Sequence, residues 1–557
     1  MVSAAKGLPS SWQVETRRNV KWVAELGSQT YAGPVVSGGR VFVGTNNEHP
    51  RDAGAPGDRG VLMAFAAASG SFLWQATHPK LAAGRSQDWP LEGLCSTPAV
   101  LGDRLYYLSN RGEMVALDAA TGTRVWTLDL IRELGVVPHY MTASSPVVAD
   151  PLVFAVTGNG PGLDGKVPAP GAPSFIAVDR ATGKPRWSDS SPGAGLHEGQ
   201  WSSPAYGMIA GRPQVLFGGG DGWLYAFAPE SGKLLWRFDA NRPARPGDER
   251  LREAIVATPV IHEGKVYVGV GRDPQKPAGP GRLWALEASA DGTVRPVWSL
   301  GGGELGTTLS TVAVADGVLY AADFAGFLHA VDAATGRPLW KYDALASIWG
   351  SPLVADGKVY LGDEDGDVLV FQAGRALRLL AKMNLGSAIY TTPAARDGVL
   401  YVASRSRLFA FQETSGTLGA RAPAGAARAH GRGESGSAHR GVVARADGGT
   451  GLVFEAAVVA GDRAGVGAGD ARGSRRRPGV ARCEVAQGLS ADRQFLQLPS
   501  LVHRVSPCGS ARLRHLTPEP SGTHFRRAVY QRQMPRTGRA IVPGKAPGGP
   551  EDPGDPR

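Results

Sequence analysis

An eleven-residue frame recurs along the first 412 residues and constrains the fold of this chain more than any other feature. The frame consists of Ala, any residue, Asp, two further residues, Thr-Gly, three further residues and Trp. It is complete at Ala116–Trp126, Ala177–Trp187 and Ala330–Trp340, with looser copies at Ala64–Trp74, Ala226–Trp236 and, in a stretched form, Ala285–Trp298. A period of about 40 to 60 residues is typical of repeat architectures, in which each unit buries its faces only against its neighbours.

Each repeat has the pattern of short antiparallel strands. From Leu309 the chain shows an apolar run, a turn at Asp316-Gly317, a second run, a turn at Gly326, and a third run before Trp340. Asp-Gly and Thr-Gly pairs accept the backbone conformations of tight turns, and alternating Val, Leu, Tyr and Phe between them indicate strands. No segment up to Phe411 has a helical period. We therefore predict an all-β chain built of four-stranded antiparallel blades.

A second frame, a small residue and Pro before an apolar pair, marks the innermost strand of each blade. It occurs at Pro34, Pro98, Pro146, Pro204, Pro259, the Pro-less pair Thr311-Val312, Pro352 and Pro393. This count predicts an eight-bladed β-propeller. The Trp frame is lost in the last two blades, whereas Trp22 precedes the first blade and has no blade of its own. We expect the N-terminal strand to close the ring, with Trp22 in the outer strand of blade eight; the alternative is that Trp22 caps blade one.

Charge divides the chain into two parts. The formal net charge is +10, but residues 413–557 contain 22 basic and 12 acidic residues, whereas residues 1–412 contain 38 of each. A neutral propeller has no electrostatic reason to bind DNA or RNA, so we expect no nucleic-acid partner. The extent of the repeat assigns the propeller to residues 19–412.

Residues 413–557 lack the repeat and are rich in Arg, Gly, Ala and Pro. Such a composition does not bury enough apolar surface to offset its ordering entropy, so we expect a disordered C-terminal tail. A second interpretation stays open. A reading-frame shift in a GC-rich gene would also end the repeat abruptly after Gly416.

The motifs resemble those of a known family. Gln200–Tyr206, Gly218–Phe227 and Gly362–Val368 combine the Ser-Pro entry to an inner strand with the Asp-Gly hairpin. Together with the Trp frame they resemble the pyrroloquinoline-quinone-like (PQQ-like) β-propeller repeat, and in detail its BamB-like, non-catalytic branch. The resemblance covers about Asn19 to Gln412 and implies a quinoprotein-like propeller.

The resemblance also implies that the ring of Trp residues packs in the seams between blades. These structural docking residues are Trp22, Trp74, Trp126, Trp187, Trp236, Trp298 and Trp340. Each buries about 150 to 250 Å². Function is therefore expected elsewhere.

In a propeller of this connectivity, two sets of loops share one face around the channel mouth, and function is expected there. The loops entering the inner strands contribute Asp88, Trp89, His139, Tyr140, Gln200, Trp201, Trp349 and Tyr390. The loops joining the second strand to the third contribute Asn46, Asn47, Arg111, Asn159, Asp221, Arg272, Asp273, Asp323, Asp363, Glu364 and Asp365. Aromatic side chains mixed with carboxylates and amides suit a peptide, a sugar or a ring-shaped cofactor. For Asp221-Gly222 and Asp365-Gly366, a hairpin turn is the purely structural alternative.

The expected function is a non-catalytic scaffold whose rim binds a protein or a polysaccharide, with a BamB-like role in envelope and outer-membrane protein assembly and no cofactor. The alternative is a quinoprotein alcohol dehydrogenase that uses PQQ and calcium. The resemblance implies an adjacent cysteine pair in those enzymes, and the propeller contains Cys95 alone. Asp363–Asp367 lacks the twelve-residue spacing of a calcium loop.

The sequence predicts no membrane span, because no apolar run approaches the necessary length. Met1–Gly7 also lacks the apolar core of a signal peptide. We expect a monomeric propeller, cytoplasmic if the given start is correct. Family resemblance instead implies the periplasm or cell envelope.

Overall fold

The structure is a computed structural model that describes residues 1–81, 90–140, 142–241, 252–273, 276, 279–301 and 303–414. The candidate rim residues Asp88 and Trp89 lie outside the described residues. So do all but the first two residues of the predicted tail.

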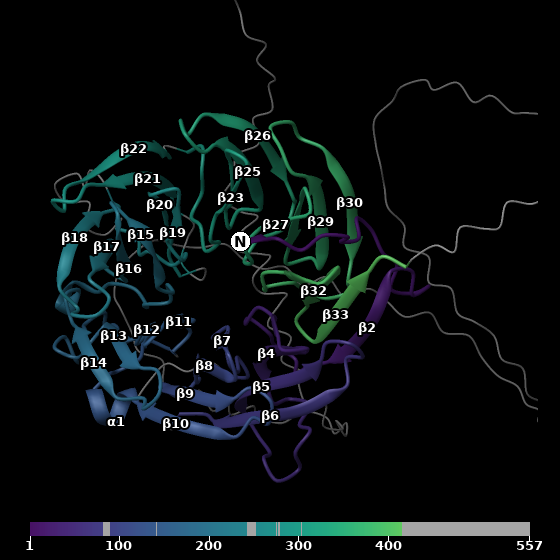
Figure 1. Ribbon diagram of the computed structural model, residues 1–557, viewed down its shortest axis with the longest axis horizontal. Coiled ribbons are helices and arrows are strands. Elements are labelled where there is room, and N and C mark those ends of the chain that lie inside the picture. The colour runs from purple at the N-terminus through teal and green to yellow at the C-terminus, as the bar shows by residue number, and fades with distance from the viewer. Residues whose placement is uncertain are drawn as a thin grey trace, which may run out of the picture. The chain divides into compact units, whose positions relative to one another are not determined.

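Eight blades form a ring, as the sequence predicts (Figure 1). Each blade has four antiparallel strands, with an inner strand of three to five residues nearest the centre of the ring, and the sheet of blade seven contains a fifth strand, β1(Val2–Ser3). The first four blades are β3(Val35–Ser37), β4(Arg40–Asn46), β5(Arg59–Ala66) and β6(Phe72–Pro79); β7(Ala99–Leu101), β8(Arg104–Leu108), β9(Glu113–Asp118) and β10(Arg124–Asp129); β11(Val147–Ala149), β12(Leu152–Val156), β13(Phe175–Asp179) and β14(Pro185–Asp189); and β15(Ala205–Ile209), β16(Arg212–Gly218), β17(Trp223–Phe227) and β18(Leu234–Asp239).

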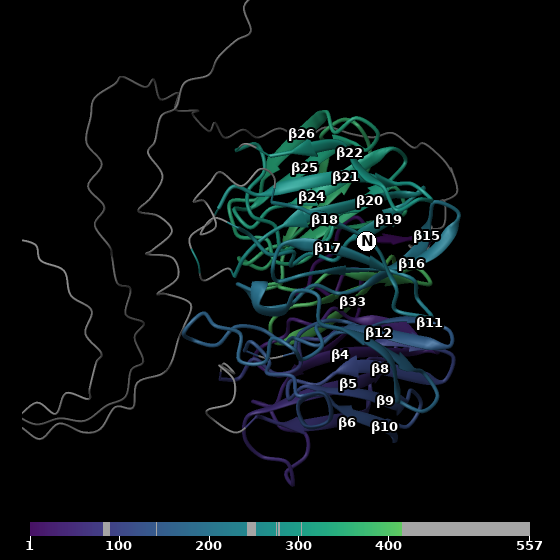
Figure 2. The same ribbon diagram turned by 90° about the vertical axis from the view of Figure 1, so that its left-hand side faces the viewer.

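Blades five to seven follow the same order. They are β19(Val260–His262), β20(Lys265–Val270), β21(Arg282–Ala288) and β22(Val294–Leu300); β23(Ala313–Ala315), β24(Val318–Ala322), β25(Phe327–Asp332) and β26(Pro338–Asp343); and β27(Leu353–Ala355), β28(Lys358–Gly362), β29(Asp367–Gln372) and β30(Leu379–Asn384). A short strand, β1(Val2–Ser3), pairs in parallel with the channel edge of β27. Both views place this N-terminal end among the inner strands (Figures 1 and 2).

Blade eight draws strands from both ends of the repeat region, which confirms the predicted closure. Its strands β31(Ala394–Arg396), β32(Val399–Ala403) and β33(Arg407–Gln412) are completed by β2(Val20–Glu25). Trp22 lies opposite Ala410, and its indole N–H donates to the carbonyl of Ala67 in blade one at 3.0 Å. The N-terminal strand thereby joins the last blade to the first.

The residues of the recurrent eleven-residue frame form the contact between neighbouring blades, in which the Trp of one copy packs against the Gly of the next copy. In blade two Trp126 lies opposite Ala116, and its indole N–H donates to the carbonyl of Arg180 in blade three at 3.0 Å. Gly183 lies against the indole with φ +74°, and a Cβ at this position would lie 2.6 Å from the ring. A side chain there would be both strained and too close, so the frame requires glycine. Asp179 fixes the turn by accepting hydrogen bonds from Thr182 and from two backbone N–H groups.

The same register holds in seven blades. The pairs are Ala64–Trp74, Ala116–Trp126, Ala177–Trp187, Ala226–Trp236, Ala285–Trp298, Ala330–Trp340 and Ala410–Trp22. Six of these indoles donate to a backbone carbonyl of the next blade, and Trp236 donates to Gln214 instead.

The prediction of no helix is wrong at one short segment. α1(Leu130–Leu134) follows β10 and is capped by Asp129, whose carboxylate accepts from the amide of Arg132, and by Gly135 with φ 70°. A single turn with local caps carries too few residues to show a helical period.

Candidate binding site at the channel mouth

The loops that enter the inner strands are joined to one another by hydroxyl groups. In six of these contacts the amide of a residue before an inner strand donates to the Ser or Thr hydroxyl at the corresponding position of the next blade, at 2.9 to 3.1 Å. We call these hydroxyls the hydroxyl belt: Thr97, Ser145, Ser203, Thr311, Ser351 and Thr392. The belt holds the entry loops in fixed positions relative to one another, which gives the channel mouth a rigid base.

Four aromatic rings gather at one side of the mouth. We call Tyr31, Phe324, Trp349 and Tyr390 the mouth cluster. Tyr31 and Tyr390 are stacked with ring centroids 5.0 Å apart, and Trp349 meets the edge of Tyr390 at 5.2 Å. Phe324 contacts Trp349 at 5.2 Å. The rings come from blades one, six, seven and eight, and Tyr31 and Trp349 are half-buried.

A second aromatic group comes from the entry loops of blades three and four. Tyr140 and Trp201 are nearly parallel with centroids 6.1 Å apart, and His139 contacts both rings. The Nδ1 atom of His139 lies 2.6 Å from the carbonyl oxygen of Pro161. Burial lowers the pKa of His139, so the imidazole is neutral at pH 7.

Most predicted amide side chains at the mouth hold loops in place. Asn46 donates to Ser28 and to the carbonyl of Leu91, while Asn47 donates within its own loop. Asn159 accepts from the amide of Val137 and donates to the carbonyl of Ala169. Gln200 donates to the carbonyl of Asn159 and to Ser174. All four of these predicted residues are buried.

Three predicted carboxylates occupy turns between second and third strands, and their surroundings differ. Asp221 accepts from the amide of Trp223 and the hydroxyl of Tyr225, and burial raises its pKa. Burial alone would raise the pKa of Asp323, but hydrogen bonds from His329 and from the amide of Phe327 lower it.

Asp363 lies at the position in blade seven that Asp323 occupies in blade six. One carboxylate oxygen accepts from the amide of Asp367, and the other has no hydrogen-bond partner among the described residues. Leu369 stands six residues further on, where blade six has His329. Burial therefore raises the pKa of Asp363 to about 6.

The predicted cations of the rim pair with carboxylates that the sequence analysis did not single out. The guanidinium of Arg111 lies 3.3 Å from Glu113, and that of Arg272 lies 2.8 Å from buried Glu253. Asp273 hydrogen-bonds with Tyr140 and contributes to raising the pKa of that phenol, after burial as the larger cause. Glu364 is half-buried and Asp365 is exposed.

Sequence reasoning missed Tyr31, Phe324 and the hydroxyl belt. Tyr31 stands three residues before Pro34, the same spacing that Trp201, Trp349 and Tyr390 have from their prolines. That alignment is visible in the sequence and would have found Tyr31. The Ser or Thr before an inner-strand proline is also visible in the sequence. Its hydrogen bond to the neighbouring blade is not, because that contact forms only when the blades are arranged in a ring.

A family model described as outer membrane protein assembly factor BamB matches residues 58–296 and 277–498. The chain belongs to the BamB family.

Individual BamB proteins are similar over most of their length. BamB of Moranella endobia (strain PCIT) is 24% identical over 380 residues, which cover 67% of this chain and 84% of the relative. BamB of Yersinia pestis is 24% identical over 315 residues, covering 55% and 70%. The solved structure of quinohemoprotein alcohol dehydrogenase from Comamonas testosteroni has a TM-score of 0.50 at 16% identity, covering 70% of this chain and 76% of that one. At that identity the likeness shows the fold alone.

The quinoprotein alternative would require sites for PQQ and calcium at the mouth of this BamB-family propeller. Within the described ranges, no three His, Cys, Asp or Glu side chains are grouped so that they could hold a metal ion. Cys95 is the one cysteine among the residues that the structure describes, and neither of its neighbours in the sequence is a cysteine.

Across the residues that the structure describes, no helix has the length and apolar character needed to cross a membrane.

Proposed function

We propose that this BamB-family propeller is a non-catalytic scaffold that binds a protein partner through its channel mouth. The mouth cluster is the observation that carries the proposal. Tyr and Trp side chains are enriched in the energetically dominant parts of protein interfaces. In this chain such rings come from several blades and remain partly exposed around Tyr31 and Trp349.

The polar groups of the mouth support binding more than catalysis. Asn46, Asn159, Gln200 and Asp323 are buried and hold loops through hydrogen bonds. A catalytic set needs a reactive side chain that can reach substrate. The half-buried aromatic rings present contact surface instead, and the hydroxyl belt keeps that surface rigid.

The relatives suggest the setting of this interaction. The matching family model and the similar proteins of Moranella endobia and Yersinia pestis are named outer membrane protein assembly factors. We accordingly assign the propeller to the cell envelope, where its partner belongs to the machinery that assembles outer membrane proteins. A polysaccharide ligand is the competing outcome of the test.

The test is capture from envelope extracts of the native host with tagged full-length chain. Trp349→Ala should reduce the yield of the captured partner at least about tenfold, because truncating a central aromatic residue commonly costs 2 kcal/mol or more of binding. The control is Leu234→Ala, since Leu234 is 39% exposed at the start of β18, beside the hairpin from β17 and therefore on the face opposite the entry loops. Equal losses with both variants, or with neither, would refute the face assignment. Captured material that survives protease digestion would indicate a polysaccharide.

A further inference from the structure

Blade seven lacks the docking Trp that the other seven blades have. In its sheet Ala381 lies opposite Val370, at the register where Trp340 lies opposite Ala330 in blade six. The strand irregularity that follows this pair is the same in both blades. The seam between blades seven and eight is therefore without an indole from its own outer strand.

Trp12 fills this seam from outside the repeat. It is 2% exposed and stacks on Phe411 with ring centroids 4.1 Å apart and an interplanar angle of 15°. Phe411 is the blade-eight counterpart of Phe371, which the docking residue Trp340 contacts at 5.8 Å. The indole of Trp12 thus meets the same element of the following blade as an ordinary docking Trp.

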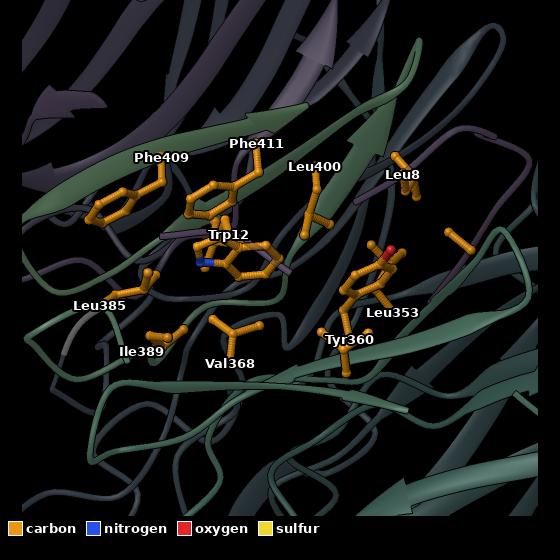
Figure 3. Packing of buried hydrophobic residues seen from close by; sticks show 13 residues of the cluster. Leu8, Trp12, Leu353, Tyr360, Val368, Leu385, Ile389, Leu400, Phe409 and Phe411 are labelled. Atoms are coloured by element: carbon orange, nitrogen blue, oxygen red, sulfur yellow. The ribbon is translucent and has the colours of Figure 1, made fainter. Parts of the chain in front are cut away.

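The cluster around Trp12 includes residues of both blades. Tyr360 and Val368 come from blade seven, and Phe409 and Leu400 come from blade eight. Figure 3 shows the indole between Phe411 on one side and Val368, Leu385 and Ile389 on the other. Ala381 is half-buried and packs against the same cluster.

The segment that delivers Trp12, residues 1–14, is here called the N-terminal strap. The amide of Leu8 donates to the carboxylate of Asp356 at 3.0 Å, and the carbonyl of Leu8 accepts from Lys358. The hydroxyl of Tyr360 donates to the carbonyl of Pro9 at 3.0 Å. These three hydrogen bonds hold Leu8 and Pro9 against blade seven, and they thereby place Trp12 in a defined position in the cluster.

We propose that the N-terminal strap supplies, through Trp12, the docking residue that blade seven lacks, and that it thereby positions the rim loop carrying Tyr390. Leu385 and Ile389 belong to the Trp12 cluster and lie in the loop between β30 and β31. Their amides donate to the carbonyls of Gly366 and Asp363 at 2.8 and 2.9 Å. Trp12 therefore packs beneath the loop from which Tyr390 joins the mouth cluster.

The decisive test is a double-mutant cycle between Trp12 and Ala381. Trp12→Ala should lower the Tm by at least about 5 °C, since it opens a cavity in a packed seam. Ala381→Trp in the wild-type chain should also lower the Tm, because the space is already filled. In the Trp12→Ala chain, however, Ala381→Trp should raise the Tm, because the indole returns from the outer strand of blade seven itself. Additive losses in the double variant would overturn the proposal.

Two controls keep the cycle interpretable. Trp340→Ala removes the docking residue of the neighbouring seam, and Ala381→Trp should give it no rescue. Should Trp12→Ala fail to fold, Trp12→Phe replaces it in the cycle. Failure of Ala381→Trp to rescue Trp12→Phe would then count against the proposal in the same way.

Hydrogen exchange tests the positioning of the loop separately from stability. The amides of Leu385 and Ile389 should exchange at least about tenfold faster in Trp12→Ala, and the double variant should recover slow exchange. The amide of Phe324, which donates to the carbonyl of Thr307, is the reference from the same face. Equal acceleration at Phe324, or unchanged exchange at Leu385 and Ile389, would refute a local role of the strap.

Discussion

Single residues explain why the repeat is so regular. In blade six, Asp332 accepts hydrogen bonds from Thr335 and from two backbone amides, and Gly336 with φ +73° lies against Trp298 of blade five. The pKa of Asp332 is lowered to about 2. The hydrogen bond from the side chain of Arg375 is the largest cause, and the hydrogen bonds from Thr335 add to it. Because each position has a separate steric or hydrogen-bonding role, the frame tolerates little change and is readable from sequence.

The exceptions to the repeat are also decided at single residues. Sequence comparison of the blades places Asp323 and Asp363 at equivalent positions. It does not show that His329 donates to the first carboxylate, whereas Leu369 leaves one oxygen of the second without a donor. The second oxygen of Asp363 lacks a donor because it is buried away from water, and that burial arises only when the blades pack into the ring.

Asp363 gives a pH-dependent prediction. Its pKa rises from an ordinary value of 3.8 to about 6 on folding, so the native state binds a proton more tightly than the unfolded chain. The free energy of unfolding should therefore fall as the pH rises from about 4 to about 6, and Asp363→Asn should remove that loss. The difference of about two pKa units corresponds to about 3 kcal/mol at pH 7.

Urea denaturation between pH 4 and pH 7 measures this effect. Asp363→Asn should become more stable relative to wild type as the pH rises, whereas exposed Asp365→Asn should follow wild type. Identical pH profiles for Asp363→Asn and wild type would show that the carboxylate carries no such penalty.

At the scale of strands and loops, the sequence predicts what the repeat displays. The proline frames locate the eight inner strands, and the surplus Trp22 correctly predicts that β2 completes blade eight. The N-terminal strap could not be found in this way, because Trp12 belongs to no repeat and its partners lie about 400 residues further along the chain.

The hydroxyl belt provides a prediction at the same scale. The amide of Thr258 donates to the hydroxyl of Thr311 in the next blade at 3.1 Å. Thr311→Val keeps the shape but leaves that amide without a partner, so the free energy of unfolding should fall by about 1 to 3 kcal/mol. Thr16→Val, at an exposed hydroxyl bonded only to Gln13, is the matched control and should change stability by less than about 0.5 kcal/mol. Chemical denaturation of both variants checks the prediction, and equal effects would show that the belt does not hold the loops.

For the whole molecule, the repeat pattern predicts which loops share a face better than it predicts which side chains are accessible there. Trp201, Trp349 and Tyr390 were predicted at the mouth and contact other aromatic rings there. Asn159 and Gln200 were selected by the same argument, yet their side chains are buried in loop contacts. Loop position follows from the repeat, whereas the direction of a side chain depends on neighbouring blades.

Binding through the mouth is the central claim for the whole molecule. Site-specific photo-crosslinking in intact cells tests it most directly, with a photoreactive phenylalanine analogue placed at Trp349 in one chain and at Leu234 in another. We expect a discrete crosslinked protein from position 349 and none from position 234. Crosslinks to that same protein from position 234 alone would contradict binding through the mouth.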